Sequence, residues 1–163
     1  MEAGLNSSTN DLAEYTFIWN SEAWGITQKS LKNLRNELSL RIKNETCVVQ
    51  VETNPLVCGY FIVDKTKREV AFTGDGFRMD RGGEGGAGFK TVEKLFRIFS
   101  LGPDMELDCS EAIKTVMNSS YGREVSDEGL HELTKATIKA EFLKIFDELE
   151  FFVLHDKNPE YIR

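Results

Sequence analysis

The chain has 163 residues, of which 40% are hydrophobic and 10% aromatic, and this composition supports a packed core and argues against global disorder. Its formal net charge of −7 at pH 7 disfavours nonspecific binding to nucleic acid and to anionic membranes. No apolar run reaches the roughly 18 residues that span a bilayer, and residues 1–11 lack the apolar core of a signal peptide, so we expect a cytoplasmic protein.

The first half of the chain predicts one helix among four strands. Residues 1–13, rich in polar residues, predict a flexible lead-in to a single domain over 14–156. Thr27 can cap a helix that runs to about Lys43, because apolar residues recur there at steps of three and four. β-prone stretches predict strands at 15–19, 47–52, 56–63 and 69–73. Polar turns join the last three of these strands, which predicts a β-meander with 56–63 in its centre.

The second half predicts helices and one short final strand. The helices are expected over 91–101, over 108–121 from a capping-box-like start at Asp108, and from Ser126 onward. Gly102-Pro103 ends the first of them and marks a possible sub-boundary at 102–105. Residues 151–154 are β-prone, and 157–163 are expected to fray. This order predicts an α+β fold: an antiparallel β-meander sheet with helices packed mainly on one face and a helical C-terminal part.

The sequence offers no convincing catalytic set. The three cysteines (Cys47, Cys58 and Cys109) are odd in number and sparse, so they do not imply a disulfide framework, and Cys47 and Cys58 are expected to be buried thiols on strands. His131 and His155 have no evident nucleophile partner, so we expect a non-catalytic protein with no firmly bound cofactor. The phenylalanines between 142 and 152 exceed what one core stripe needs, which predicts burial and, as a second interpretation, a homo-oligomer interface through the C-terminal helical part.

Residues 74–88 hold more than half of the chain's 13 glycines and lead into a predicted helix. Such a loop presents free backbone N–H groups and the positive end of a helix dipole, which together suit a phosphate group. The pattern G-x-G-x-x-G is present from Gly83 to Gly88, but the preceding strands form a meander rather than a βαβ unit. Phe89 separates Gly88 from Lys90-Thr91, which breaks the P-loop spacing.

The glycine segment, residues 74–90, therefore predicts a ligand site without matching a named motif. Its arginines and Lys90 can neutralise phosphate, Phe77 offers an aromatic face, and its carboxylates can accept hydrogen bonds from a ribose or a base. The candidate ligand-binding residues are Gly74, Asp75, Gly76, Phe77, Arg78, Arg81, Gly83, Glu84, Gly85, Gly86, Gly88 and Lys90.

Three functions compete for this sequence. The leading hypothesis is non-catalytic sensing or sequestration of a phosphorylated small molecule, in particular a nucleotide or cyclic nucleotide. The alternative is a metal-assisted hydrolase or transferase acting on a nucleotide-like substrate, in which Asp75, Asp80 and Glu84 would hold Mg²⁺. The third is an acidic interaction or inhibitor protein that uses the glycine segment as a mobile recognition surface. A glycine-rich surface loop without any ligand is the plainest interpretation of the same residues.

Overall fold

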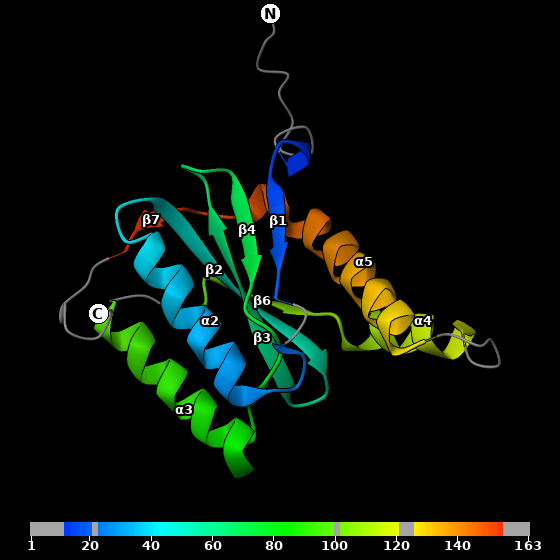
Figure 1. Cartoon of the computed structure of the whole chain (residues 1–163). Coiled ribbons are helices and arrows are strands. Elements are labelled where there is room, and N and C mark those ends of the chain that lie inside the picture. Colours follow the sequence, from blue (N-terminus) through cyan, green and yellow to red (C-terminus); the bar gives the residue numbers. More distant parts are fainter. Residues whose placement is uncertain (1–11, 21–22, 100–101, 121–125, 155–163) are drawn as a thin grey trace, which may run out of the picture.

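The computed structural model describes residues 12–20, 23–99, 102–120 and 126–154, so most of the predicted lead-in and the whole predicted tail lie outside the described residues. Figure 1 shows the chain and its elements. In order these are β1 (Thr16–Trp19), α2 (Thr27–Leu40), β2 (Glu45–Asn54), β3 (Val57–Asp64), β4 (Glu69–Phe72), β5 (Phe77–Arg78), α3 (Gly83–Ile98), β6 (Met105–Asp108), α4 (Ser110–Ser120), α5 (Asp127–Ile145), a 3₁₀ turn (Phe146–Glu148) and β7 (Phe152–Val153).

The strands form one mixed sheet of seven strands, whose main path runs β1-β4-β3-β2-β6. Strands β2, β3 and β4 pair antiparallel, which confirms the predicted meander and the central place of β3. The prediction of a purely antiparallel sheet is wrong, because β1 pairs parallel with β4 and β6 pairs parallel with β2. Helices α2 and α3 each carry the chain back across the sheet, and such crossovers are what parallel strands require.

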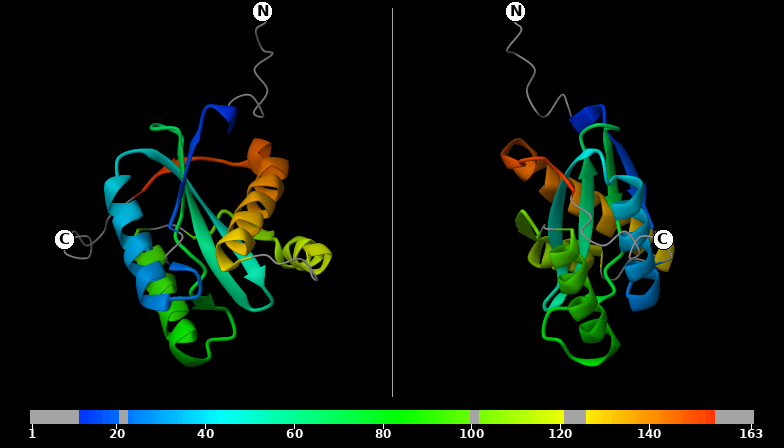
Figure 2. Two further views of the ribbon diagram at one scale, coloured as in Figure 1. Left: turned by 45° about the vertical axis from the view of Figure 1, so that its right-hand side comes forward. Right: turned by 90° about the vertical axis from the view of Figure 1, so that its left-hand side faces the viewer.

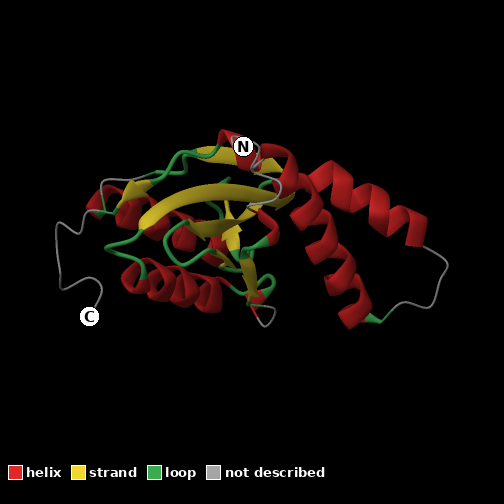
Figure 3. Cartoon of the chain, turned by 90° about the horizontal axis from the view of Figure 1, so that it is seen from above, coloured by secondary structure: helices red, strands yellow, loops and turns green. Residues whose placement is uncertain are grey.

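Helices cover both faces of this sheet, so the expectation that they pack mainly on one face is wrong. Figure 2 shows α2 and α3 on one side and α5 on the other, with α4 beside α5, and Figure 3 shows the strands between the two pairs. The reason lies in β3, which is buried along almost its whole length. Because neighbouring strand residues point to opposite faces, Tyr60 packs with the α2 and α3 core and Phe61 packs with the α5 core.

Strand β6 and the early start of α3 differ from what the sequence predicts. Strand β6 lies at the end of the sheet path, and only Leu107 among its residues is buried. Glu106 and Asp108 are exposed on it, and charged side chains of this kind protect an edge strand from pairing with another chain. Helix α3 begins at Gly83 instead of Thr91, because close packing holds residues of low helix propensity in the helix.

Two of the C-terminal phenylalanines and all three cysteines lie in the core. Phe142 is fully buried, and its ring lies 4.8 Å from that of Phe61 between centroids. Phe146 is also buried, which confirms burial for these two residues. Phe151 is partly buried against the same core, whereas Phe152 is 53% exposed, so the burial prediction is wrong for Phe152. The homo-oligomer stays a prediction. All three cysteines are buried free thiols, which confirms the burial predicted for Cys47 and Cys58. None of the described helices combines the length and the apolar character needed to cross a membrane.

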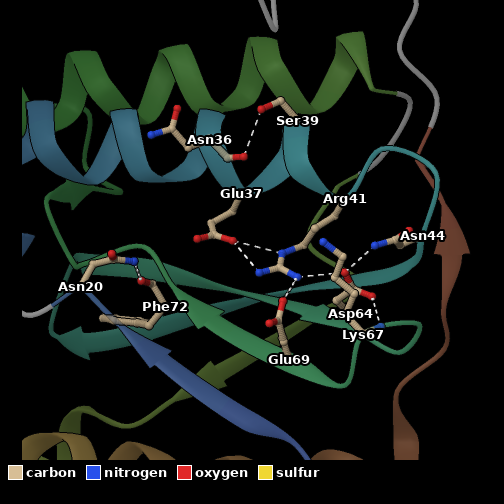
Figure 4. A network of polar contacts seen from close by, with 10 residues as sticks. All are labelled: Asn20, Asn36, Glu37, Ser39, Arg41, Asn44, Asp64, Lys67, Glu69 and Phe72. Atoms are coloured by element: carbon tan, nitrogen blue, oxygen red, sulfur yellow. Dashed lines mark hydrogen bonds and ion pairs between the residues drawn. The ribbon is translucent and has the colours of Figure 1, made fainter.

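A buried ionic network joins the end of α2 to the β3–β4 hairpin (Figure 4). Arg41 directly follows α2, and its side chain is only 3% exposed. Its guanidinium lies 2.7 Å from a Glu37 carboxylate oxygen, 2.8 Å from Asp64 and 2.7 Å from Glu69. Burial would raise the pKa of Asp64, but hydrogen bonds from Asn44, from a backbone N–H and from Arg41 outweigh burial and hold it below its ordinary value. The network therefore fixes the C-terminal end of α2 on the sheet.

Candidate functional site

The first residues of the glycine segment dock onto the start of α2. The Asp75 carboxylate accepts a hydrogen bond from the Gly25 N–H at 2.7 Å. The Gly76 carbonyl accepts one from the Thr27 hydroxyl at 2.6 Å, and the Gly76 N–H donates to the Ser30 hydroxyl at 3.1 Å. These bonds connect residues nearly 50 positions apart in the sequence, and they hold the beginning of α2 in place.

Thr27 is consequently not the cap that the sequence predicts. The N-cap of α2 is Ile26, which makes no side-chain capping bond. The Thr27 hydroxyl is buried and bonds to Gly76, so it joins two segments instead of satisfying the first turn of its own helix. This contact could not be read from the local pattern, because the partner lies far along the chain.

The glycines allow this docking because no side chain would fit at several of them. A Cβ on Gly74 would lie 2.5 Å from the Ala23 Cβ, and a Cβ on Gly88 would lie 2.4 Å from the Thr27 methyl group. Real Cβ atoms do not approach other atoms so closely. Close packing of the segment and of α3 against the start of α2 is therefore a sufficient reason for glycine at these positions.

Carboxylates of the chain itself lie at the N-terminal end of α3, which is the positive end of its helix dipole. The Asp80 carboxylate accepts hydrogen bonds from Arg78 at 3.0 and 2.5 Å and from the Gly82 N–H at 3.1 Å. The hydrogen bond from Arg78 is the main reason that the pKa of Asp80 lies below its ordinary value. Glu84 adds a second acid within the first turn. These acids complement the positive end of α3, as an anionic ligand would.

The other predicted site residues divide among different environments. Arg81 forms an ion pair with Glu93 at 2.9 Å. Phe77 is fully buried, and its ring packs against Tyr60 with 5.6 Å between centroids. Lys90 is exposed on α3. The first turns of α3 hold the remaining glycines of the set: Gly83, Gly85, Gly86 and Gly88. The glycine segment thus has three structural roles: it contacts α2, it contributes Phe77 to the core, and it forms the first turns of α3.

The three carboxylates considered for a metal have separate partners. Asp75 accepts hydrogen bonds from Gly25 and from the Thr53 hydroxyl, whereas Asp80 is held by Arg78. Glu84 is exposed in the first turn of α3. Within residues 12–20, 23–99, 102–120 and 126–154, no three His, Cys, Asp or Glu side chains gather in a way that could hold a metal ion.

A polar pocket lies beside α2, where β1 and β4 end. Its volume is about 540 Å³, which falls in the range of small-molecule sites. Strands β1 and β4 run parallel, so their carboxyl ends meet at the same edge of the sheet, which is where α/β sheets commonly bind ligands. The pocket is lined by Trp19, Asn20, Ala23, Lys29, Lys32, Asn33 and Asn36, and we call it the α2 pocket.

Two asparagine amides tie the α2 pocket to the end of β4. The Asn20 Nδ2 donates to the Phe72 carbonyl at 2.5 Å, as Figure 4 shows. The Asn33 Nδ2 donates to the Thr73 carbonyl at 3.0 Å. Each bond fixes the amide and leaves its Oδ1 as an acceptor. The α2 pocket and the glycine segment are therefore neighbours, since Thr73 directly precedes Gly74.

Lysines give the α2 pocket a positive charge that no described residue neutralises. Lys29 and Lys32 are exposed, and neither forms an ion pair within the described part of the chain. None of the described lining residues is acidic. Arg78 and Arg81, in contrast, are each paired with a carboxylate. Among the described residues, the two arginines of the glycine segment are thus neutralised by carboxylates, whereas the two lysines of the α2 pocket are not.

Sequence reasoning did not single out the α2 pocket. The available signal was the spacing of four polar residues on α2 at positions i, i+3, i+4 and i+7, which places them on one helix face: Lys29, Lys32, Asn33 and Asn36. The same spacing describes an ordinary solvated face. Only the parallel pairing of β1 with β4, which brings Asn20 beside this helix, distinguishes a pocket from a surface.

The chain was compared with protein-family models, with curated proteins and with solved structures, and none of the three comparisons found a match.

Proposed function

We propose that this protein binds a phosphorylated small molecule without transforming it, and that the α2 pocket is the binding site. The proposal keeps the ligand class that the glycine segment suggested and moves the contacts to α2. The observation that carries it is a pair of lysines, without a carboxylate partner among the described residues, in a pocket at the carboxyl ends of two parallel strands. Lysine ammonium groups are common partners of phosphate, and charge-assisted hydrogen bonds are among the stronger polar contacts.

The glycine segment and the residue before it contribute to this proposed site by fixing the positions of two lining residues, Ala23 and Asn33. Gly74 packs against Ala23, which lines the pocket, and the carbonyl of Thr73 fixes the amide of Asn33. Preorganised polar groups lose less conformational entropy when a ligand arrives. A sequestering or sensing protein needs binding of this kind and needs no nucleophile or general base.

The test is a calorimetric titration with AMP and with inorganic phosphate. We expect the double substitution Lys29→Gln/Lys32→Gln to weaken AMP binding at least about tenfold, because each charge-assisted hydrogen bond is worth about 1.5–3 kcal/mol. Both lysines are exposed, so the melting temperature should change little.

The matched control is Lys90→Gln/Lys94→Gln on α3, which removes the same charge near the glycine segment. This control should keep the affinity for AMP within about twofold, since neither lysine lines the α2 pocket and salt screens exposed charges that make no direct contact. Loss of binding in the control but not in the α2 variant would return the site to the glycine segment. Absence of any heat with both probes would eliminate the proposal.

A further inference from the structure

We infer that the α2 pocket selects the phosphate and hydroxyl groups of a sugar or polyol monophosphate, and not the base of a nucleotide. The inference rests on the proposed function and narrows its ligand class. It follows from three features: the one aromatic ring among the described lining residues is packed into the core, the amides are placed for hydroxyl groups, and the charge matches a single phosphate group.

Base recognition by stacking needs an accessible aromatic face, and the half-buried ring of Trp19 already uses one face to stack on Phe17. Its ring is stacked on Phe17 at 5.8 Å between centroids and packs against Phe61 and Phe72 at 5.8 and 5.7 Å. These rings belong to the core on the α5 face of the sheet, opposite to α2. No other lining residue among those described is aromatic.

The asparagines provide the groups that bind hydroxyls. An amide offers both donors and an acceptor, so it can bond to a sugar hydroxyl in either direction. The Nδ2 groups of Asn20 and Asn33 are directed to backbone carbonyls, which orients both side chains. Asn36 lies one helical turn after Asn33 on the same face, and its side-chain amide bonds to no described residue.

The charge of the pocket fits one phosphate group. A phosphate monoester carries about −1.5 to −2 charges at pH 7, and Lys29 with Lys32 supplies two positive charges. The described lining has no carboxylate to hold the magnesium ion that usually accompanies a triphosphate. A monophosphate is therefore neutralised by the pocket without a metal ion.

The experiment compares ribose 5-phosphate, AMP and inorganic phosphate by calorimetric titration of the full chain in the absence of metal ions. Ribose 5-phosphate should bind at least as tightly as AMP, because the base gains no contact, and about tenfold more tightly than inorganic phosphate, because several hydroxyl bonds are added.

Two variants separate the contributions of the groups. Asn36→Ala should weaken ribose 5-phosphate binding about fivefold and leave inorganic phosphate within about twofold, whereas Lys29→Gln/Lys32→Gln should weaken both. Asn118→Ala, at an exposed position of α4, is the matched control and should change neither affinity. This pattern of losses supports hydroxyl recognition by α2.

The unfavourable outcomes are distinct. AMP binding more than about tenfold tighter than ribose 5-phosphate, still dependent on the lysines, would overturn the inference and leave the proposed function standing. Equal binding of inorganic phosphate and ribose 5-phosphate would also overturn the inference, because the hydroxyls would then contribute nothing. Failure of all three probes to bind would remove the inference together with the proposed function.

Discussion

Substituting Arg41 by methionine is expected to lower the free energy of unfolding by about 3–5 kcal/mol at pH 7, because it leaves buried carboxylates without their cation. Asp64 is fully buried, and Glu37 lies close to the same guanidinium with a side chain only 12% exposed. Methionine can replace the aliphatic part of the side chain but donates no hydrogen bond. Urea unfolding at neutral pH measures the loss.

The pH dependence of this loss identifies its cause. The pKa of Asp64 is lowered in the folded protein, so its contribution to stability is present above its ordinary value of about 3.9 and is lost as the pH falls through the lowered folded value. Without Arg41 the pKa of Asp64 should rise, and protonation should relieve the repulsion. The difference in stability between wild type and variant should therefore shrink as the pH falls from 7 toward about 3.

Arg68→Met is the matched control for the Arg41 substitution. Arg68 pairs with Glu14, and the two side chains are 55% and 57% exposed. An exposed ion pair is worth at most about 1 kcal/mol. A loss at Arg41 no larger than the loss at Arg68 would show that the buried network does not hold the end of α2.

The second large effect is expected at Gly86. A Cβ there would lie 2.0 Å from the carbonyl carbon of Arg81, and backbone cannot move aside as a flexible side chain can. Alanine gains about 1 kcal/mol in helix propensity over glycine, but the clash should exceed this gain. Gly86→Ala should therefore destabilise the protein by at least about 2 kcal/mol, measured by urea unfolding.

Neighbouring glycines provide the contrast. A Cβ on Gly85 would meet the exposed side chain of Arg78, which can rotate away, so Gly85→Ala should change stability by less than about 1 kcal/mol. Gly83 has open space around it but a φ of +62°, so alanine there should cost about 1 kcal/mol of backbone strain. Equal losses at Gly85 and Gly86 would show that the chain around Arg81 is not packed on α3 as described.

Periodic segments were predictable from the sequence, and their partners were not. The strand at 56–63 was identified correctly because its apolar residues are almost continuous, yet the same continuity also signals burial on both faces, which the prediction of one helical layer overlooked. Strand β6 was not predicted, because its alternation of acidic and apolar residues is only four residues long. Whether strands pair in parallel depends on contacts between distant parts of the chain.

For the glycine segment too, the composition was informative, but the partner of the segment could not be predicted from the sequence. Its composition predicted backbone that turns through positive φ or closely approaches a ligand, and in the structure the backbone closely approaches Ala23 and Thr27 of the same chain. A ligand and a neighbouring segment impose the same requirement for glycine. Lys29 and Lys32 are the opposite case, because their spacing is that of an ordinary helix face. They line a pocket only because the sheet places Asn20 beside α2.

The two attachments of α2 have a mechanical consequence. Hydrogen bonds to Gly76 restrain the first turn, and Arg41 restrains the last, so the helix has little freedom to shift along or away from the sheet. A molecule that settles on its outer face would leave the backbone where it was. Any signal that such binding sends to another protein would then travel as a change of surface charge, and not as a change of shape.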